Sequence, residues 1–106
     1  MVGKTPGKAG GARTKWTFLT NHAHVLIALA RDPDARVRDL ADAVAITERA
    51  VQQILTDLEE AGVLTRAREG RRNHYSIDRT ATLRHSNEAG GSVADLLALA
   101  QPHEER

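Results

Sequence analysis

The chain has 106 residues, a formal net charge of +1 and no cysteine. This length suits one small domain, and the lack of cysteine excludes disulfides and thiolate metal sites. No apolar run is long enough to span a bilayer, and no signal peptide is visible at Met1. We therefore expect a cytoplasmic protein that does not contact a membrane.

Composition separates two tails from a body. Residues 1–15 are rich in Gly, Lys and Ala, contain no acid and show no periodicity, so we expect a disordered basic tail. Residues 102–106 should form a short polar tail, which leaves residues 16–101 as the folded domain. Charge is segregated within this domain, because residues 32–60 are acidic whereas residues 66–84 hold six arginines and only two acids.

The first predicted helix covers residues 21–31. Thr20 or Asn21 can cap its start, and the Asp32-Pro33-Asp34 run should end it. Its apolar stripe consists of Ala23, Leu26, Ile27 and Ala30, and Val25 and Leu29 add to its width. A helix this apolar should be buried on two sides, one facing its own domain and the other a second subunit.

Two short amphipathic helices follow, at about residues 38–44 and 47–61. Each has an apolar stripe at helical spacing. The stripes are Val37, Leu40, Ala41 and Val44, and then Val51, Ile54, Leu55 and Leu58. The connection Ala45-Ile46 is short enough to set the helices at a large angle, as in a helix-turn-helix. Many such motifs have Gly in this turn, where the present chain has Ala45.

The outward face of the third helix has the side chains of a DNA-reading surface. Thr47 can cap this helix, and Gly62 suits the left-handed residue that ends it. The face opposite the apolar stripe holds Arg49, Gln52, Gln53 and Thr56. Arg pairs with guanine and Gln with adenine in the major groove, and Thr suits phosphate or a thymine methyl. The alternative is an ordinary solvated helix face.

A basic hairpin comes next. Residues 63–68 and 73–77 predict two strands around the tip Glu69-Gly70-Arg71-Arg72, where Gly70 supplies a positive φ. We expect this wing, about residues 64–77, to contact phosphate or a narrow minor groove. The candidate residues are Arg66, Arg68, Arg71, Arg72, Asn73 and His74. The alternative is a surface hairpin of mixed charge.

From about Trp16 to Gln101 the chain resembles bacterial winged helix-turn-helix transcriptional regulators of the broad MarR/ArsR-like group. The resemblance lies in LTNHAHVLIALARDP, in RVRDLADAVAITERAVQQILTDLEEAGVLTR and in REGRRNHYSI. It implies a mainly helical fold with a small β-hairpin wing, and a homodimer that binds double-stranded DNA sequence-specifically.

By position, the resemblance also assigns residues. Thr47, Arg49, Gln52 and Gln53 correspond to the groove-reading residues of the family, and Arg71 and Arg72 to its wing tip. The thiolate metal site of many ArsR-type sensors is missing, because there is no cysteine. A small-molecule effector is left open.

The last predicted helix runs from its cap Ser92 to about Gln101, after an irregular connection over residues 78–91. A helix this short must pack on something, either its own domain or a dimer partner, and the resemblance favours the dimer. We expect the dimer interface to combine this helix with the segment ahead of the first helix and the first helix itself. The expected contact residues are Trp16, Phe18, Leu19, Leu26, Leu96 and Leu97.

The histidines and serines do not predict an enzyme. His22 and His24 lie two apart on a helix and point to different sides. His85, Glu88 and His103 could build a metal site at a dimer interface, but soluble loops often hold such residues without function. No serine has a nucleophile context, and no phosphate loop or nucleotide fingerprint is present. We therefore expect no catalysis, metal or cofactor.

One competing function keeps the fold. A winged-helix module can bind a protein in place of DNA, but such modules usually lose the basic wing or carry acids on the groove face. The present chain has Arg71 and Arg72 at the wing tip and Gln52 and Gln53 where bases would be read. The sequence therefore favours DNA binding. The basic tail over residues 1–15 is either a solubilising segment or an arm that engages DNA.

Overall fold

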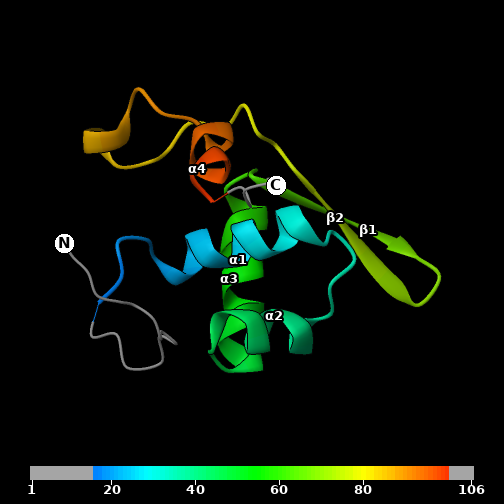
Figure 1. The fold of residues 1–106 in the computed structure, drawn as a ribbon. Coiled ribbons are helices and arrows are strands. Elements are labelled where there is room, and N and C mark those ends of the chain that lie inside the picture. Colours follow the sequence, from blue (N-terminus) through cyan, green and yellow to red (C-terminus); the bar gives the residue numbers. More distant parts are fainter. Residues whose placement is uncertain (1–15, 101–106) are drawn as a thin grey trace, which may run out of the picture.

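The computed structural model describes residues 16–100. Its elements are α1 (Asn21–Arg31), α2 (Val37–Val44), α3 (Glu48–Glu60), β1 (Leu64–Glu69), β2 (Arg72–Ile77), the short 3-10 helix η2 (Ser86–Glu88) and α4 (Val93–Leu99). This is the predicted winged helix-turn-helix, with the hairpin projecting from a helical body (Figure 1). No helix between residues 16 and 100 has the length and apolarity that a membrane crossing requires. The two predicted tails lie outside the described residues.

Helix α1 is the centre of the hydrophobic core. The Thr20 hydroxyl caps it by accepting from the Ala23 N–H at 3.3 Å. It contacts α2, α3, α4 and β2, and Figure 1 shows it running between α2 and α4. Five of its residues are buried, namely Ala23, Val25, Leu26, Ile27 and Leu29. The helix is buried on two sides as expected, but α4 of the same chain covers the side that we expected to meet a second subunit.

The turn between α2 and α3 is built by a left-handed alanine. Ala45 has φ 66° and ψ 46°, and it is the one non-glycine residue with positive φ between residues 16 and 100. Its N–H and that of Ile46 both donate to the Ala41 carbonyl, at 2.8 and 3.1 Å. Because Cβ makes this conformation costly, the backbone is strained at Ala45. A glycine at this position would adopt the same conformation without that strain.

Replacing Ala45 with glycine should therefore stabilise the fold. Relief of left-handed strain outweighs the added freedom of the unfolded chain, for a net gain of about 0.5–1 kcal/mol in the free energy of unfolding. The matched control is Ala43→Gly on the exposed side of α2, which should lose about 0.5–1 kcal/mol. Urea denaturation of the two variants measures both changes, and a loss of stability in Ala45→Gly would contradict the left-handed turn.

Helix α3 begins and ends where its caps predict. The Thr47 hydroxyl accepts from the Ala50 N–H at 3.0 Å, and Gly62 has φ 79° just after the helix. The stripe Val51, Ile54, Leu55 and Leu58 is buried. This packing turns the opposite face of α3 to solvent, and that face is the predicted reading surface.

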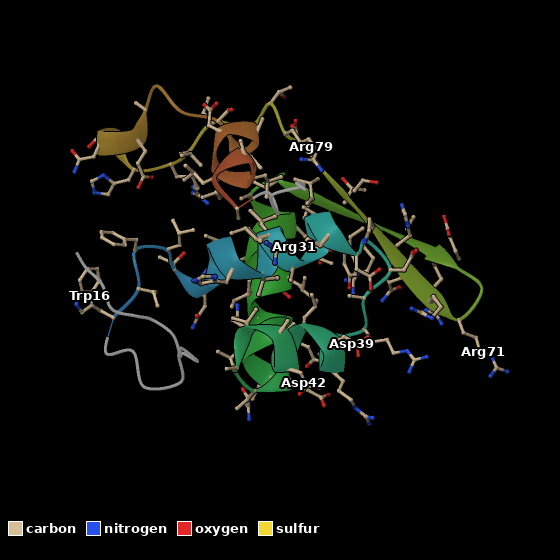
Figure 2. The ribbon with its side chains drawn as sticks, in the orientation of Figure 1. Trp16, Arg31, Asp39, Asp42, Arg71 and Arg79 are labelled. Carbon is tan, nitrogen blue, oxygen red and sulfur yellow. The ribbon has the colours of Figure 1, made fainter. Side chains whose placement is uncertain are left out.

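The wing strands differ by one residue from their predicted bounds. Both reach further toward the tip, so that Glu69 pairs with Arg72 and only Gly70 and Arg71 form the turn. Gly70 has φ 65°, as the turn was expected to require. The short turn directs Arg71 away from the body of the domain, as Figure 2 shows.

Helix α4 closes the core of its own chain. Ser92 and Asp95 form a reciprocal capping box at its start. Val93 and Leu97 are buried against the rest of the core, and the Arg31 guanidinium donates to the Ala100 carbonyl at 2.7 Å. Helix α4 therefore packs on its own chain, with its buried side against α1. Its predicted end at Gln101 falls outside the described residues.

Candidate nucleic-acid interface

The exposed face of α3 carries the predicted reading residues together. Arg49, Gln52, Gln53 and Thr56 are all exposed, while the stripe behind them is buried. Thr47 lies at the start of the same helix, where its hydroxyl oxygen already serves as the N-cap. These side chains form a continuous polar surface without an acid between residues 49 and 56, which is the composition that a helix in a major groove needs.

A hydrogen-bonded chain that the sequence did not reveal orients Gln53. The Gln53 side-chain amide donates to Asp57 Oδ1 at 3.0 Å, and the His22 ring contacts Asp57 Oδ2 through Nε2 at 2.8 Å. The hydrogen bond from His22, and then that from Gln53, holds the pKa of the Asp57 carboxyl below its ordinary value. The spacing of Gln53 and Asp57 could have suggested their contact, but nothing in the sequence places His22 beside them.

The wing arginines have different partners. Arg66 pairs with Glu59 of α3 at 3.1 Å, and Arg68 donates from Nε to the Gly70 carbonyl at 3.1 Å. Arg72 donates to the Asp34 carbonyl at 2.6 Å. Among the residues that the structure describes, Arg71 has no such partner, and its side chain extends from the tip (Figure 2). Three of the four arginines therefore brace the wing, and Arg71 is the one best placed to reach a ligand.

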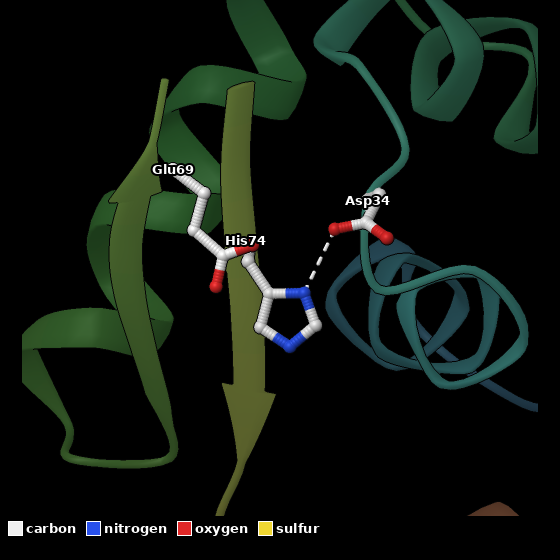
Figure 3. A group of neighbouring side chains, drawn as sticks. All are labelled: Asp34, Glu69 and His74. Carbon is white, nitrogen blue, oxygen red and sulfur yellow. Dashed lines mark hydrogen bonds and ion pairs between the residues drawn. The ribbon is translucent and has the colours of Figure 1, made fainter. Parts of the chain in front are cut away.

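Strand β2 of the wing is fastened to the loop between α1 and α2. The Tyr75 N–H of β2 donates to the Pro33 carbonyl at 3.0 Å, next to the contact of Arg72 with Asp34. His74 Nδ1 contacts the Asp34 carboxylate at 2.8 Å (Figure 3). This hydrogen bond raises the pKa of His74 above its ordinary value, and the negative charges of Asp34 and Glu69 act in the same direction. His74 thus has a partner within the chain, and Asn73 beside it is half-buried.

The predicted dimer residues separate into buried and exposed groups. Leu26 and Leu97 are buried in the core of their own chain, and Leu19 and Leu96 are partly buried against it. Trp16 and Phe18 are 65% and 90% exposed, with their rings in an edge-to-face contact at 4.8 Å. Leu26 and Leu97 therefore serve the monomer.

A mainly apolar groove of about 510 Å³ lies beside these exposed aromatics. It is lined by the segment ahead of α1, by α1 itself and by α4 with the loop that precedes it. Leu99, which was not among the predicted contact residues, is 76% exposed at its edge. The groove and the exposed aromatics form one apolar surface, which lies on a different part of the domain from the wing tip.

Comparison with known proteins decides the family. The model of the MarR family matches residues 17–72, which is more than half of the chain. The chain belongs to the MarR family. The matched region contains α1, α2, α3 and β1 and ends at the first residue of β2. No curated protein matches the sequence.

Two solved structures share the fold. One is the PcaV transcriptional regulator from Streptomyces coelicolor in complex with its natural ligand, at 21% identity and a TM-score of 0.53. The other is MepR, a transcription regulator of the Staphylococcus aureus multidrug efflux pump MepA, at 19% identity and a TM-score of 0.51. Each similarity covers 76% of the present chain but only 59% and 56% of those chains, respectively. The chain thus spans little more than half the length of these regulators, and at such identities they show the fold alone.

Proposed function

We propose that this MarR-family protein is a sequence-specific, DNA-binding transcriptional regulator. Helix α3 reads the major groove, and the wing contacts phosphate or the minor groove. The observation that carries this proposal is the exposed set of Arg49, Gln52, Gln53 and Thr56 on α3, with no acid between residues 49 and 56. A solvated helix face has no need of this set, whereas base readout uses Arg and Gln in this role. We assign it no catalytic function.

Electrostatics support DNA over a protein partner. Three of the four acids of α3 lie toward its C-terminal end, where Asp57 contacts His22 and Glu59 pairs with Arg66, and the fourth, Glu48, is the first residue of the helix. The N-terminal half of a recognition helix is the part that meets bases, and the stretch of α3 from residue 49 to residue 56 holds no acid. A winged-helix module that binds a protein would more readily place acids among the reading residues.

Base readout can be tested with Arg49→Ala and Gln53→Ala. Each should weaken binding to the specific site by about 1–3 kcal/mol and relax preference at one or two base positions. Binding to random duplex should change less. Selection of bound sequences from a random DNA pool, followed by titration of the selected site, measures both effects.

The matched control for that experiment is Arg79→Ala. Arg79 is exposed and lies beyond β2, at the opposite end of the hairpin from its tip. Removing this arginine subtracts the same charge and should leave the sequence preference unchanged. If Arg49→Ala and Gln53→Ala reduce affinity for specific and random DNA equally, α3 positions the protein without reading bases.

The wing makes a separate prediction about salt. Arg71→Ala should make the plot of log affinity against log salt shallower by about 0.9, the loss expected for one phosphate contact. Arg71→Lys should keep that slope, and a selective loss on A/T-rich flanks would place Arg71 in the minor groove. Arg72→Ala should also loosen the wing, because Arg72 holds the Asp34 carbonyl. An unchanged slope in Arg71→Ala would place the tip away from DNA.

We also propose that the protein acts as a homodimer. One recognition helix offers too few base contacts to select a site in a genome, whereas two-fold pairing doubles them. The surface that fits a second copy is the apolar groove with Trp16, Phe18 and Leu99, whose exposure is large for such side chains. The interface proposed here omits Leu26 and Leu97, because the core of the monomer already buries them.

A further inference from the structure

Three metal-ligating side chains meet where the hairpin lies beside the loop between α1 and α2. One ligand atom each from Asp34, Glu69 and His74 lie within 4.8 Å of one another. The residues come from the loop between α1 and α2, from the end of β1 and from β2. Figure 3 shows the His74 imidazole between the two carboxylates. Nothing in the DNA-reading function requires this arrangement.

The cluster is preorganised by contacts that do not involve the three ligand side chains. The Tyr75 N–H donates a hydrogen bond to the Pro33 carbonyl, and the Arg72 guanidinium donates one to the Asp34 carbonyl. These two bonds fix β2 against the loop, so Asp34 and His74 are held together although they are 40 residues apart. Pairing of Glu69 with Arg72 in the hairpin register places the third ligand.

No arginine among residues 16–100 forms an ion pair with either carboxylate. Among residues 16–100, His74 is the only basic side chain within 4.0 Å of the Asp34 carboxylate, and none lies within 4.0 Å of Glu69. Two carboxylates and an imidazole therefore face one another, and the guanidinium of Arg72 is bonded to the Asp34 backbone carbonyl and not to a carboxylate. The side chains of Asp34 and His74 are 54% and 37% exposed, so an ion can enter without unfolding the domain.

The donor set matches a first-row divalent cation. Imidazole and carboxylates bind Zn²⁺ and similar ions at about 2.0–2.2 Å, so two donors on one ion lie at most about 4.4 Å apart. The present spread of up to 4.8 Å needs only a small rotation of an exposed side chain such as Glu69. Three protein ligands would leave a further position on the ion for water.

We propose that Asp34, Glu69 and His74 form a binding site for a divalent transition-metal ion, Zn²⁺ or an ion of like chemistry. The bound ion joins β1 and β2 to the loop between α1 and α2, and so fixes the angle at which the wing leaves the body. The existence of this site does not depend on DNA binding. A regulatory consequence, in which the metal ion changes DNA binding by fixing the wing, rests on the function proposed above.

Metal titration without DNA tests the site itself. Zn²⁺ is titrated in competition with a chromophoric chelator, and Co²⁺ is followed by its visible absorption. The chain should bind one ion, and His74→Gln should weaken binding by at least about tenfold. Asp34→Asn and Glu69→Gln should each weaken it as well. All three positions are on the surface, and circular dichroism checks that the variants stay folded.

Two other histidines supply the controls. His24→Gln removes an imidazole on α1 that has no part in the cluster, and His103→Gln removes one from the last six residues of the chain. Both should keep the wild-type affinity. Equal affinity in wild type and His74→Gln, or loss of binding in His103→Gln, overturns the proposal. A His74 ring whose NMR signals respond to pH but not to Zn²⁺ would show that the cluster binds only a proton, and this result would overturn the proposal too.

Wing rigidity gives a readout that is independent of affinity. Zn²⁺ should slow amide hydrogen exchange across β1 and β2 in wild type and leave it unchanged in His74→Gln. Specific DNA binding is then measured with and without Zn²⁺. Metal binding by wild type without an effect on DNA binding would keep the site and remove its regulatory role. Equal DNA binding by metal-free wild type and by Asp34→Asn would show that the reading function does not need the metal site.

Discussion

Replacing Leu29 with alanine should lower the free energy of unfolding by about 2–5 kcal/mol, because the side chain leaves a cavity that its neighbours cannot fill. Leu29 is 1% exposed and lies on α1, which contacts every other major element except β1. A small domain is stable by only about 5–15 kcal/mol. The loss should therefore remove much of the stability of the whole fold, including the reading helix.

Urea denaturation followed by circular dichroism measures this loss. The control is Leu99→Ala, which deletes the same atoms from a side chain that is 76% exposed and should change stability by no more than about 0.5 kcal/mol in the monomer. Stability of Leu29→Ala within about 1 kcal/mol of wild type would mean that α1 does not hold the core together. DNA binding by Leu29→Ala should fail first at raised temperature, as the fold melts.

Breaking the proposed dimer should have the largest effect on DNA binding. Phe18→Glu with Leu99→Glu places two charges in the apolar contact, where charges without partners are strongly disfavoured. Both residues are largely exposed in the monomer, so helix content by circular dichroism should persist. Sedimentation should then show monomers, and specific DNA binding should fall to a weak, salt-sensitive level.

The choice of residues matters for that experiment. Leu97→Glu would bury a charge within the monomer core and unfold the chain, so its failure to bind DNA would say nothing about dimers. Ala94→Glu with Ala98→Glu supplies the matched control, because it adds the same two charges on exposed positions of α4 and should leave the dimer intact. A wild-type protein that sediments as a monomer at the concentrations of the binding assay would refute the dimer.

Much of the fold follows from local rules that a sequence displays. Apolar spacing at 3.6 residues marks the buried faces of α2 and α3, and Thr20, Thr47 and Ser92 cap the helices that they precede. Gly62 and Gly70 take positive φ where helix α3 and the hairpin need it. These signals act over a few residues along the chain, so no knowledge of the tertiary structure is required to read them.

The same rules describe which face of an element is apolar but not what covers it. The sequence favours a second subunit against one side of the first helix, and α4 of the same chain lies there. Leu26 and Leu97 are equally apolar whether they face their own core or a partner, so periodicity alone cannot separate the two cases. Only the packing of α4 on α1 assigned them to the monomer.

The roles of the wing arginines also depend on tertiary contacts. The sequence established four arginines on one hairpin beside a reading helix, and with them the basic character of the wing. Arg66 is held by Glu59, and Arg72 is held by the backbone carbonyl of Asp34, which is 38 residues away in the sequence. These contacts decide which arginines are bound to the domain and which one extends into solvent. Pairings over such separations arise from the way helices and hairpin pack together. The tertiary structure alone therefore singled out Arg71, and it alone brought Asp34, Glu69 and His74 to one place.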